Sequence, residues 1–152
     1  MISPELLRRH AFFGFMDDAQ QKAVAMISEE VAFEKDALII KENSPATNLY
    51  FLLEGSVGYY FIVEEGHNKK ELFISDINLG EIFGISALVD PYHYSAAIRA
   101  NERCRVIKID AIALRALLQV DGRLSCNMMR EVAKSLMQRL NDTRVQLAAA
   151  HA

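Results

Sequence analysis

The sequence predicts a mainly β domain with helices at both ends. Between residues 31 and 109, short segments rich in Val, Ile, Phe and Tyr alternate with turn clusters such as "ENSPATN" and "EEGHNKK". A strand spacing of roughly 8–12 residues favours a sandwich or barrel over βαβ units. Helical patterns lie only before and after this region. A chain of 152 residues is long enough for one domain with a hydrophobic core.

The N-terminal part, residues 1–30, is predicted to be a helical lead-in to the strands. Asp17 and Asp18 can cap a helix that we expect to continue to Glu30. Apolar residues then follow at helical spacing and predict one buried face. That face consists of Ala19, Ala23, Met26 and Ile27.

The strand region itself, residues 31–109, contains one strong turn signal. Glu54 and Gly55 separate "YFLL" from "SVGYYFIV", and glycine can take the positive φ that a tight hairpin needs. We therefore expect a hairpin at this point. Two further strands, "YSAAIRA" and "RCRVIKI", are joined by Asn101 and Glu102 and end the region.

The C-terminal part, residues 110–150, is predicted to hold a short helix and a long one. Asp110 can cap "AIALRALL", "VDG" ends that helix, and a single helix continues from Arg123. Its apolar stripe has spacings of three and four, which suit a partner helix. We expect the first half of the stripe to pack on the protein's own barrel and the second half to extend beyond it, so that a second copy of the chain covers it. The predicted dimer interface consists of Met129, Val132, Leu136, Leu140, Thr143 and Leu147.

Composition and charge exclude several classes of function. A net charge of −3 and a pI near 5.8 argue against a dedicated nucleic-acid surface. The two cysteines, Cys104 and Cys126, have no metal-ligand spacing and are expected to be free thiols in a reducing compartment. No apolar run approaches the length of a membrane span, and the N-terminus lacks a signal-peptide layout. We therefore expect a cytoplasmic protein without a membrane partner.

Catalytic and metal-binding motifs are also missing from the sequence. The four histidines form no H-x-H pair, and no nucleophile elbow, Walker loop or dinucleotide fingerprint is present. We expect no metal site and no enzymatic activity. A metal-dependent barrel enzyme is the least favoured alternative, and the metal content of the purified protein would test it.

One order of segments is more specific. "ALIIKENSPATNLYFLLEGSVGYY", then "LGEIFGISAL", then "YSAAIRA" resembles the cyclic-nucleotide-binding domain, and more narrowly the sensor half of Crp/Fnr-type transcription regulators. The resemblance covers about residues 12–147. It implies a jelly-roll β-barrel that closes over a ligand and a long C-terminal helix that dimerises. Residues 1–152 then form one such domain.

The same resemblance raises the question of DNA. In the regulators a winged helix-turn-helix domain follows the sensor half, and no segment of this chain has the pattern of a recognition helix. We expect no DNA contact from this chain, and DNA binding only if a further C-terminal domain exists. The sequence is compatible with a stand-alone sensor domain and with a shortened regulator.

The chain departs from the family pattern at its ligand anchors. Ile85 stands where the family has a glutamate that accepts the ribose hydroxyl, and Tyr94 stands where it has the arginine that pairs with the cyclic phosphate. The surrounding small residues match. The residues of the candidate pocket are Gly84, Ile85, Ser86, Ala87, Tyr94, Ser95 and Ala96.

Both losses weaken phosphate binding. Removing the cation of such a pair costs about 3–5 kcal/mol, and losing the ribose anchor costs about 1–3 kcal/mol more. Backbone N–H groups near Ser86 and Ala87 and the Ser95 hydroxyl are the remaining phosphate donors. Arg99 should lie farther along its strand, which leaves His93 as the better substitute cation. Ordinary cAMP or cGMP binding is not expected.

The sequence leaves three interpretations of this pocket open. It could take a neutral or aromatic small-molecule effector, with the Tyr94 phenol as a polar handle. Alternatively, Tyr94 fills the space and the protein is a structural dimerisation module without a ligand. In the third interpretation, other contacts make it a cyclic-nucleotide sensor after all. No cofactor follows from any of them.

Overall fold

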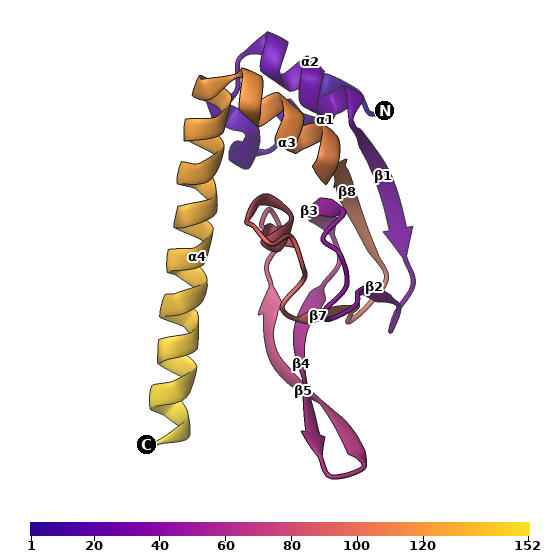
Figure 1. The fold of residues 1–152 in the computed structure, drawn as a ribbon, viewed down its shortest axis with the longest axis vertical. Coiled ribbons are helices and arrows are strands. Elements are labelled where there is room, and N and C mark those ends of the chain that lie inside the picture. Colours follow the sequence, from indigo (N-terminus) through magenta and orange to yellow (C-terminus); the bar gives the residue numbers. More distant parts are fainter.

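Two four-stranded antiparallel sheets form the body of the molecule; the shorter helices lie at one end of it, and the long C-terminal helix extends along one side (Figure 1). The computed structural model describes residues 1–152. The first sheet has the strand order β1 (Ser28–Phe33), β8 (Cys104–Asp110), β3 (Asn48–Glu54) and β6 (Ile82–Phe83). The second has the order β2 (Leu38–Ile40), β7 (Ala97–Ala100), β4 (Val57–Glu65) and β5 (Asn68–Ile77). This is the antiparallel roll with flanking helices that the sequence predicted.

The N-terminal lead-in is shorter than predicted. It contains α1 (Pro4–Arg8), the 3-10 helix η1 (Ala11–Phe15) and α2 (Asp18–Met26). The predicted cap at Asp17 is confirmed, because its carboxylate accepts from the N–H of Gln20 and forms a capping box with it. The β-roll begins at Ser28 instead of residue 31. The Ser28 hydroxyl donates to the Val24 carbonyl at 2.6 Å, and Ser28 already pairs with Ile109.

The buried face of α2 was predicted wrongly. Met26 is 67% exposed, whereas Gln20 and Gln21 are buried beside Val24. The two glutamines are buried because each has a polar partner. Gln20 donates to Asp121 at 3.1 Å, and Gln21 accepts from Arg8 at 2.9 Å. Hydrogen bonds to other elements therefore override the simple apolar pattern here.

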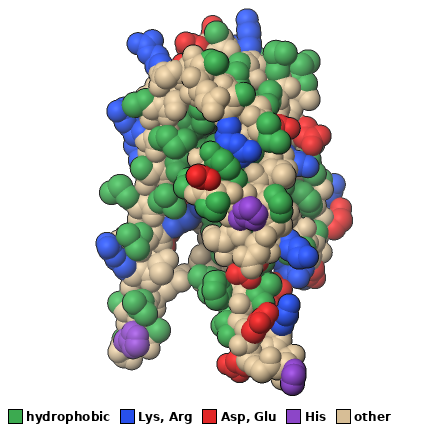
Figure 2. All heavy atoms as spheres, viewed as in Figure 1, with side chains coloured by type: hydrophobic (Ala, Val, Ile, Leu, Met, Phe, Trp, Pro, Cys, Tyr) green, Lys and Arg blue, Asp and Glu red, His purple; other side chains and the backbone are tan.

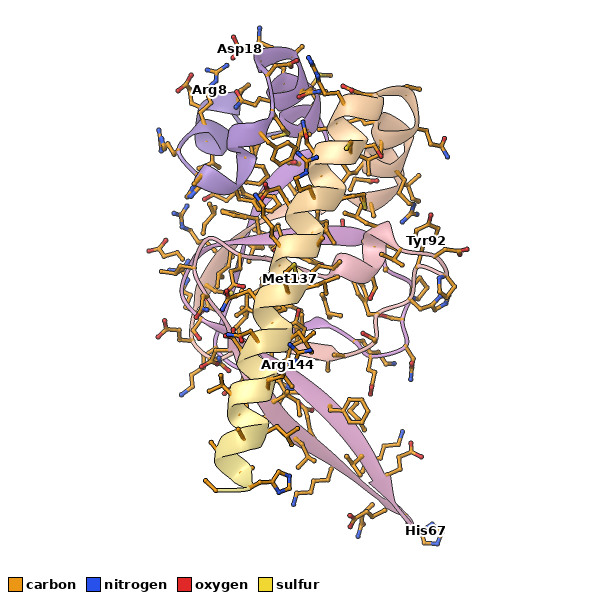
Figure 3. The ribbon with its side chains drawn as sticks, turned by 90° about the vertical axis from the view of Figure 1, so that its left-hand side faces the viewer. Arg8, Asp18, His67, Tyr92, Met137 and Arg144 are labelled. Atoms are coloured by element: carbon orange, nitrogen blue, oxygen red, sulfur yellow. The ribbon has the colours of Figure 1, made fainter.

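The turn at Gly55 is not a hairpin. It connects β3 in the first sheet to β4 in the second, and these two strands do not pair. Gly55 has φ +88°, and a Cβ at this position would collide with the Arg103 carbonyl, so the position requires glycine. The tight hairpin is instead β4–β5, which projects from the body and ends near His67 (Figures 1 and 3).

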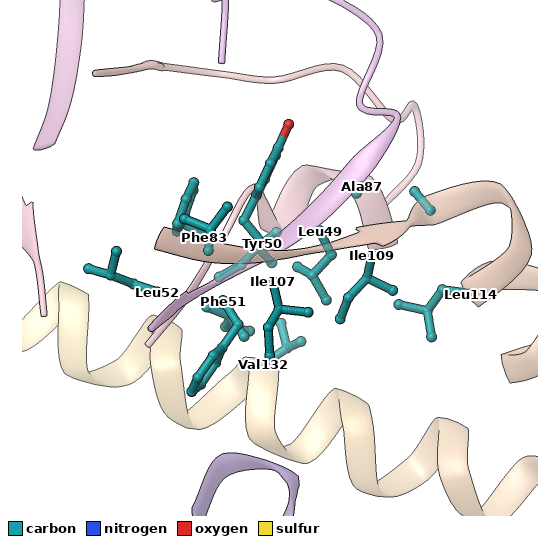
Figure 4. Close-up of a cluster of buried hydrophobic side chains, with 14 of the residues drawn as sticks. Leu49, Tyr50, Phe51, Leu52, Phe83, Ala87, Ile107, Ile109, Leu114 and Val132 are labelled. Carbon is teal, nitrogen blue, oxygen red and sulfur yellow. The ribbon is translucent and has the colours of Figure 1, made fainter. Parts of the chain in front are cut away.

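The core lies where the first sheet meets the C-terminal helices. Figure 4 shows Leu49 and Phe51 of β3 beside Ile107 and Ile109 of β8, with α4 packed alongside. All four side chains are fully buried. This apolar cluster joins the first sheet to the C-terminal helices.

The two predicted C-terminal helices are confirmed. They are α3 (Ala111–Val120) and α4 (Gly122–Ala150). Asp110 caps α3 by accepting from the N–H of Ala113 at 2.9 Å. Asp121 separates the helices and caps α4 by accepting from the N–H of Leu124 at 3.0 Å. None of the helices combines the length and the apolar character that crossing a bilayer would require.

The long helix α4 is divided into a buried and an exposed half. Leu124, Met128 and Val132 are buried in the first half, and Met129 packs against the same core. Val132 is thus unavailable to a partner chain, which corrects its predicted place in a dimer interface. The second half stands away from the body (Figures 1 and 2). Its exposed apolar side chains are Leu136, Met137, Leu140, Val145 and Leu147.

Candidate functional site

A cavity of about 290 Å³ lies between the segment after β6, the start of β7 and the middle of α4. Eight of its twelve lining residues are hydrophobic. Six of the seven residues predicted for the pocket line it: Gly84, Ile85, Ser86, Tyr94, Ser95 and Ala96. The sequence reasoning missed the other six: Ile40, Tyr59, Val89, Ile98, Leu136 and Arg139. The cavity therefore has a loop wall, which was predicted, and a helix wall, which was not.

The loop wall contains a backbone turn at Gly84. This residue has φ +74°, and a Cβ would lie 3.1 Å from the Asn48 carbonyl oxygen, so both conformation and space favour glycine. The short 3-10 helix η2 (Ile85–Leu88) follows it. The N–H of Ala87 donates to the Gly84 carbonyl at 3.0 Å and is therefore already used within the turn. One of the two backbone donors that were expected for a phosphate is thus committed.

Ala87 lies outside the cavity, which corrects its predicted place in the pocket. It is fully buried, and its carbonyl oxygen accepts from the Arg115 guanidinium of α3 at 2.7 Å. The same guanidinium lies 4.1 Å from the centre of the Tyr92 ring. The hydrogen bond to Ala87 therefore connects the loop wall to α3.

Tyr94 contributes its ring to the cavity, while its hydroxyl faces the backbone of β3. The phenol donates to the Asn48 carbonyl at 2.6 Å and accepts from the Asn48 N–H at 3.1 Å. Burial raises the pKa of Tyr94, although these hydrogen bonds lower it in part. The phenol is therefore not the free polar handle that one of the three interpretations of the pocket assumed. The ring also leaves the cavity open, because the 290 Å³ remains beside it.

No cation lies on the loop wall. The Arg99 guanidinium binds both carboxylate oxygens of Glu71, at 2.6 and 3.2 Å, and does not line the cavity. His93 is exposed, with its Nδ1 3.0 Å from the Pro91 carbonyl, and it does not line the cavity either. The expectation for Arg99 is confirmed, and His93 is not a substitute for the missing arginine.

The helix wall carries the only charge in the cavity lining. Arg139 of α4 donates to the Ile82 carbonyl oxygen of β6, and its guanidinium lies 5.1 Å from the centre of the Tyr59 ring. Burial raises the pKa of Tyr59, and the charge of Arg139 partly opposes this rise. Leu136, one turn earlier, is half exposed at the same wall.

The signal for Arg139 was present in the sequence. Arg139 follows the buried Val132 by 139 − 132 = 7 residues, and residues seven apart share a helix face. An arginine on the core-facing side of α4 was therefore predictable. That this face meets the cavity was not, because the position of α4 depends on tertiary packing.

Metal chemistry finds no support in the arrangement of side chains. Nowhere in residues 1–152 do three or more His, Cys, Asp or Glu side chains gather around a point that could hold a metal ion. Cys104 is buried and Cys126 is exposed, and both are free thiols.

Comparisons with known proteins agree with this geometry. The profile of the cyclic nucleotide-binding domain matches residues 30–121. The cAMP-activated global transcriptional regulator CRP of Salmonella typhimurium is 29% identical over 105 residues, which are 68% of this chain and 49% of that protein. The chain thus spans about half the length of this curated relative.

Solved structures extend the similarity to nearly the whole chain. A candidate cyclic nucleotide-binding protein of Geobacter metallireducens is 38% identical with a TM-score of 0.81, over 92% of this chain and 99% of that one. The sensor domain of the transcriptional regulator DNR from Pseudomonas aeruginosa has a TM-score of 0.70 at 22% identity, over 90% of this chain and 95% of that one. The second likeness concerns the fold alone.

Proposed function

Because this chain belongs to the cyclic nucleotide-binding domain family and is related to Crp/Fnr-type regulators, we propose that it is a non-catalytic sensor domain whose cavity takes a small, largely apolar effector in place of a cyclic nucleotide. One observation carries this proposal. The loop wall, where the family holds ribose and phosphate, has Ile85 and Tyr94, and the Tyr94 hydroxyl is bound to the backbone of Asn48.

The size and polarity of the cavity support a small apolar effector. Its volume of about 290 Å³ is at the low end of the roughly 300–1,000 Å³ that ligand pockets span. A cyclic nucleotide brings a phosphate, a sugar hydroxyl and a base, and each needs a polar partner when it leaves water. Ser86 and Ser95 are the only polar side chains of the loop wall besides Tyr94, whose hydroxyl is bound to the backbone of Asn48. An apolar ligand would lose less hydration free energy when it enters the cavity.

Dimerisation through the exposed half of α4 is the second part of the proposal. Leu136, Met137, Leu140 and Leu147 are each at least half exposed on this helix. Figure 3 shows Met137 facing outward from the body, so a second α4 can approach it. A symmetric pair of helices would bury the same apolar face on both copies. The interface predicted from sequence thus loses Val132 and gains Met137.

The effector would act by changing how α4 rests on the roll. Leu136 and Arg139 line the cavity and belong to the helix that carries the proposed dimer face. A ligand that favours one position of α4 would therefore shift the population of dimer geometries. In a regulator, this shift would be passed to a DNA-binding domain that lies outside residues 1–152.

Isothermal titration of the purified chain tests the effector proposal. We expect no heat from cAMP or cGMP at micromolar concentrations and measurable binding of indole, a neutral aromatic probe. Ala96→Phe, which fills the cavity from its lining, should abolish the indole signal. Thermal unfolding of the variant checks that it still folds. Micromolar binding of cAMP to the natural chain would overturn the charge argument.

An Ile85→Glu, Tyr94→Arg double variant sharpens the same test. It restores both family anchors and should gain cAMP binding if the shape of the cavity is intact. Tyr94→Arg also removes the two hydrogen bonds to Asn48, so the single Ile85→Glu variant is measured beside it. If no probe binds to any of these proteins, the structural dimerisation module is the correct interpretation.

A further inference from the structure

We infer that the effector carries one carboxylate on an apolar or aromatic body, and that Arg139 of α4 receives this carboxylate. The inference rests on the proposed effector cavity and names the chemical class of its ligand. Its starting observation is Arg139, the one charged residue in the lining of a mostly apolar cavity, whose contacts are a backbone carbonyl and a tyrosine ring.

Arg139 combines a place in the cavity lining with the lack of an acidic partner, whereas four of the ten arginines form ion pairs with carboxylates. Arg8, Arg99 and Arg105, for example, each form an ion pair with a glutamate. Arg139 is half-buried and forms no ion pair, and its contacts are the Ile82 carbonyl and the Tyr59 ring. A cation withdrawn from water gains most from an anion at the same place. The structure provides the cation and a cavity beside it.

Glu81, the acidic residue whose charge also affects Tyr59, does not form an ion pair with Arg139. Glu81 raises the pKa of Tyr59, after the larger effects of burial and Arg139. However, the Glu81 carboxylate accepts from the backbone N–H of Asn78 at 2.9 Å and makes no ion pair with Arg139. The positive charge at the helix wall is therefore available to a ligand.

The geometry of the guanidinium favours a carboxylate. An arginine has five N–H donors in a planar fork, and only one bond, from Nη2 to Ile82, is formed here. The remaining donors can bind two oxygens of one carboxylate. The ring of Tyr94 and the side chains of Ile40, Ile85 and Ile98 would contact the apolar body.

The position of Arg139 also distinguishes the proposed carboxylate ligand from a cyclic nucleotide. In the family pattern the phosphate-binding arginine stands on the loop wall, at the position of Tyr94 here. The cation of this chain stands on the helix wall, on the element proposed to dimerise. A carboxylate at Arg139 would hold α4 directly to the ligand, and so couples binding to the position of that helix.

Titration of the chain with acids and their amides tests the inference. The probes are phenylacetate, 3-phenylpropionate and octanoate, each beside its uncharged amide. We expect the acids to bind roughly ten- to a hundredfold more tightly than the amides. In Arg139→Gln this preference should disappear while amide binding remains, which shows that the cavity survives. Arg139→Lys should retain part of the preference, because the charge remains without the fork.

Lys134→Gln is the matched control. It removes one positive charge from the same helix at an exposed side chain whose partner is Glu131. We expect it to keep the full preference for acids. An equal loss in Lys134→Gln would mean that only the overall charge matters, and would overturn the role of Arg139. Unchanged acid binding in Arg139→Gln would overturn it as well.

The outcomes also distinguish this inference from the proposed function. If amides and indole bind but acids are not preferred, the cavity is an effector site and the carboxylate assignment is wrong. If none of the acids, amides and indole binds, the effector site itself is wrong. Tight binding of cAMP that disappears in Arg139→Gln would assign the cation to a cyclic phosphate and overturn the carboxylate.

Discussion

The two halves of α4 have similar apolar spacing and different surroundings. In the first half, Leu124, Met128 and Val132 are buried against the protein's own roll. In the second half, Met137 is 71% exposed and Leu140 is 50% exposed. Arg139 lies at the transition, where the helix passes the cavity. The comparison teaches that apolar periodicity identifies a buried face but does not identify the element that buries it.

The largest expected effect is on the free energy of unfolding, which a substitution in the buried half of α4 should lower far more than one in the exposed half. Met128→Ala removes a fully buried side chain and should lower the free energy of unfolding by about 2–5 kcal/mol. Met137→Ala removes the same atoms from the exposed half and should change it by about 0.5 kcal/mol or less in the monomer. Urea denaturation measures both free energies, at a protein concentration below the dissociation constant of the proposed dimer. Equal losses would show that the exposed half is also packed within one chain.

The next effect concerns association. Leu140→Asp places a charge in the proposed interface twice, once from each copy, so we expect the dimer to weaken by about two orders of magnitude. The thermal stability of the monomer should stay unchanged because Leu140 is outside the core. Sedimentation velocity over a concentration series measures the association. A natural chain that stays monomeric at every concentration would refute this interface, and Lys134→Gln serves as the control that should still dimerise.

The parts of the fold that were predictable depend on neighbouring residues in the sequence. The caps at Asp17 and Asp110, the break before α4 and the antiparallel roll follow from local patterns, whereas the cap at Asp121 was not predicted. The pairing of strands does not, and for this reason the turn at Gly55 was interpreted as a hairpin although it joins two sheets.

The candidate site shows the same division. Glycine and small residues marked the loop wall, and six of the seven predicted residues do line the cavity. The role of the Tyr94 hydroxyl was missed because its partner, the backbone of Asn48, is 46 residues away in the sequence. The helix wall was missed because Leu136 was assigned to a dimer face alone. Contacts between distant segments therefore decide the chemistry of this cavity.

The smallest expected effect concerns the junction that begins α4. The backbone N–H of Leu124 and then the amide of Gln20 hold the pKa of Asp121 below its ordinary value. A carboxylate whose pKa is lowered by folding stabilises the folded state above its unfolded pKa of about 3.9. This stabilisation is lost as the pH falls through the lower pKa of the folded protein.

Thermal unfolding between neutral and acidic pH should show the loss in the natural chain. The Asp121→Ala variant should be less stable at neutral pH, and its stability should depend less on pH in the acidic range. Because water reaches this carboxylate, the change is expected to be smaller than those at Met128 and Leu140. If Asp121→Ala kept the acid dependence of the natural chain, other carboxylates would be responsible, and the buried half of α4 would depend on its apolar contacts without help from its cap.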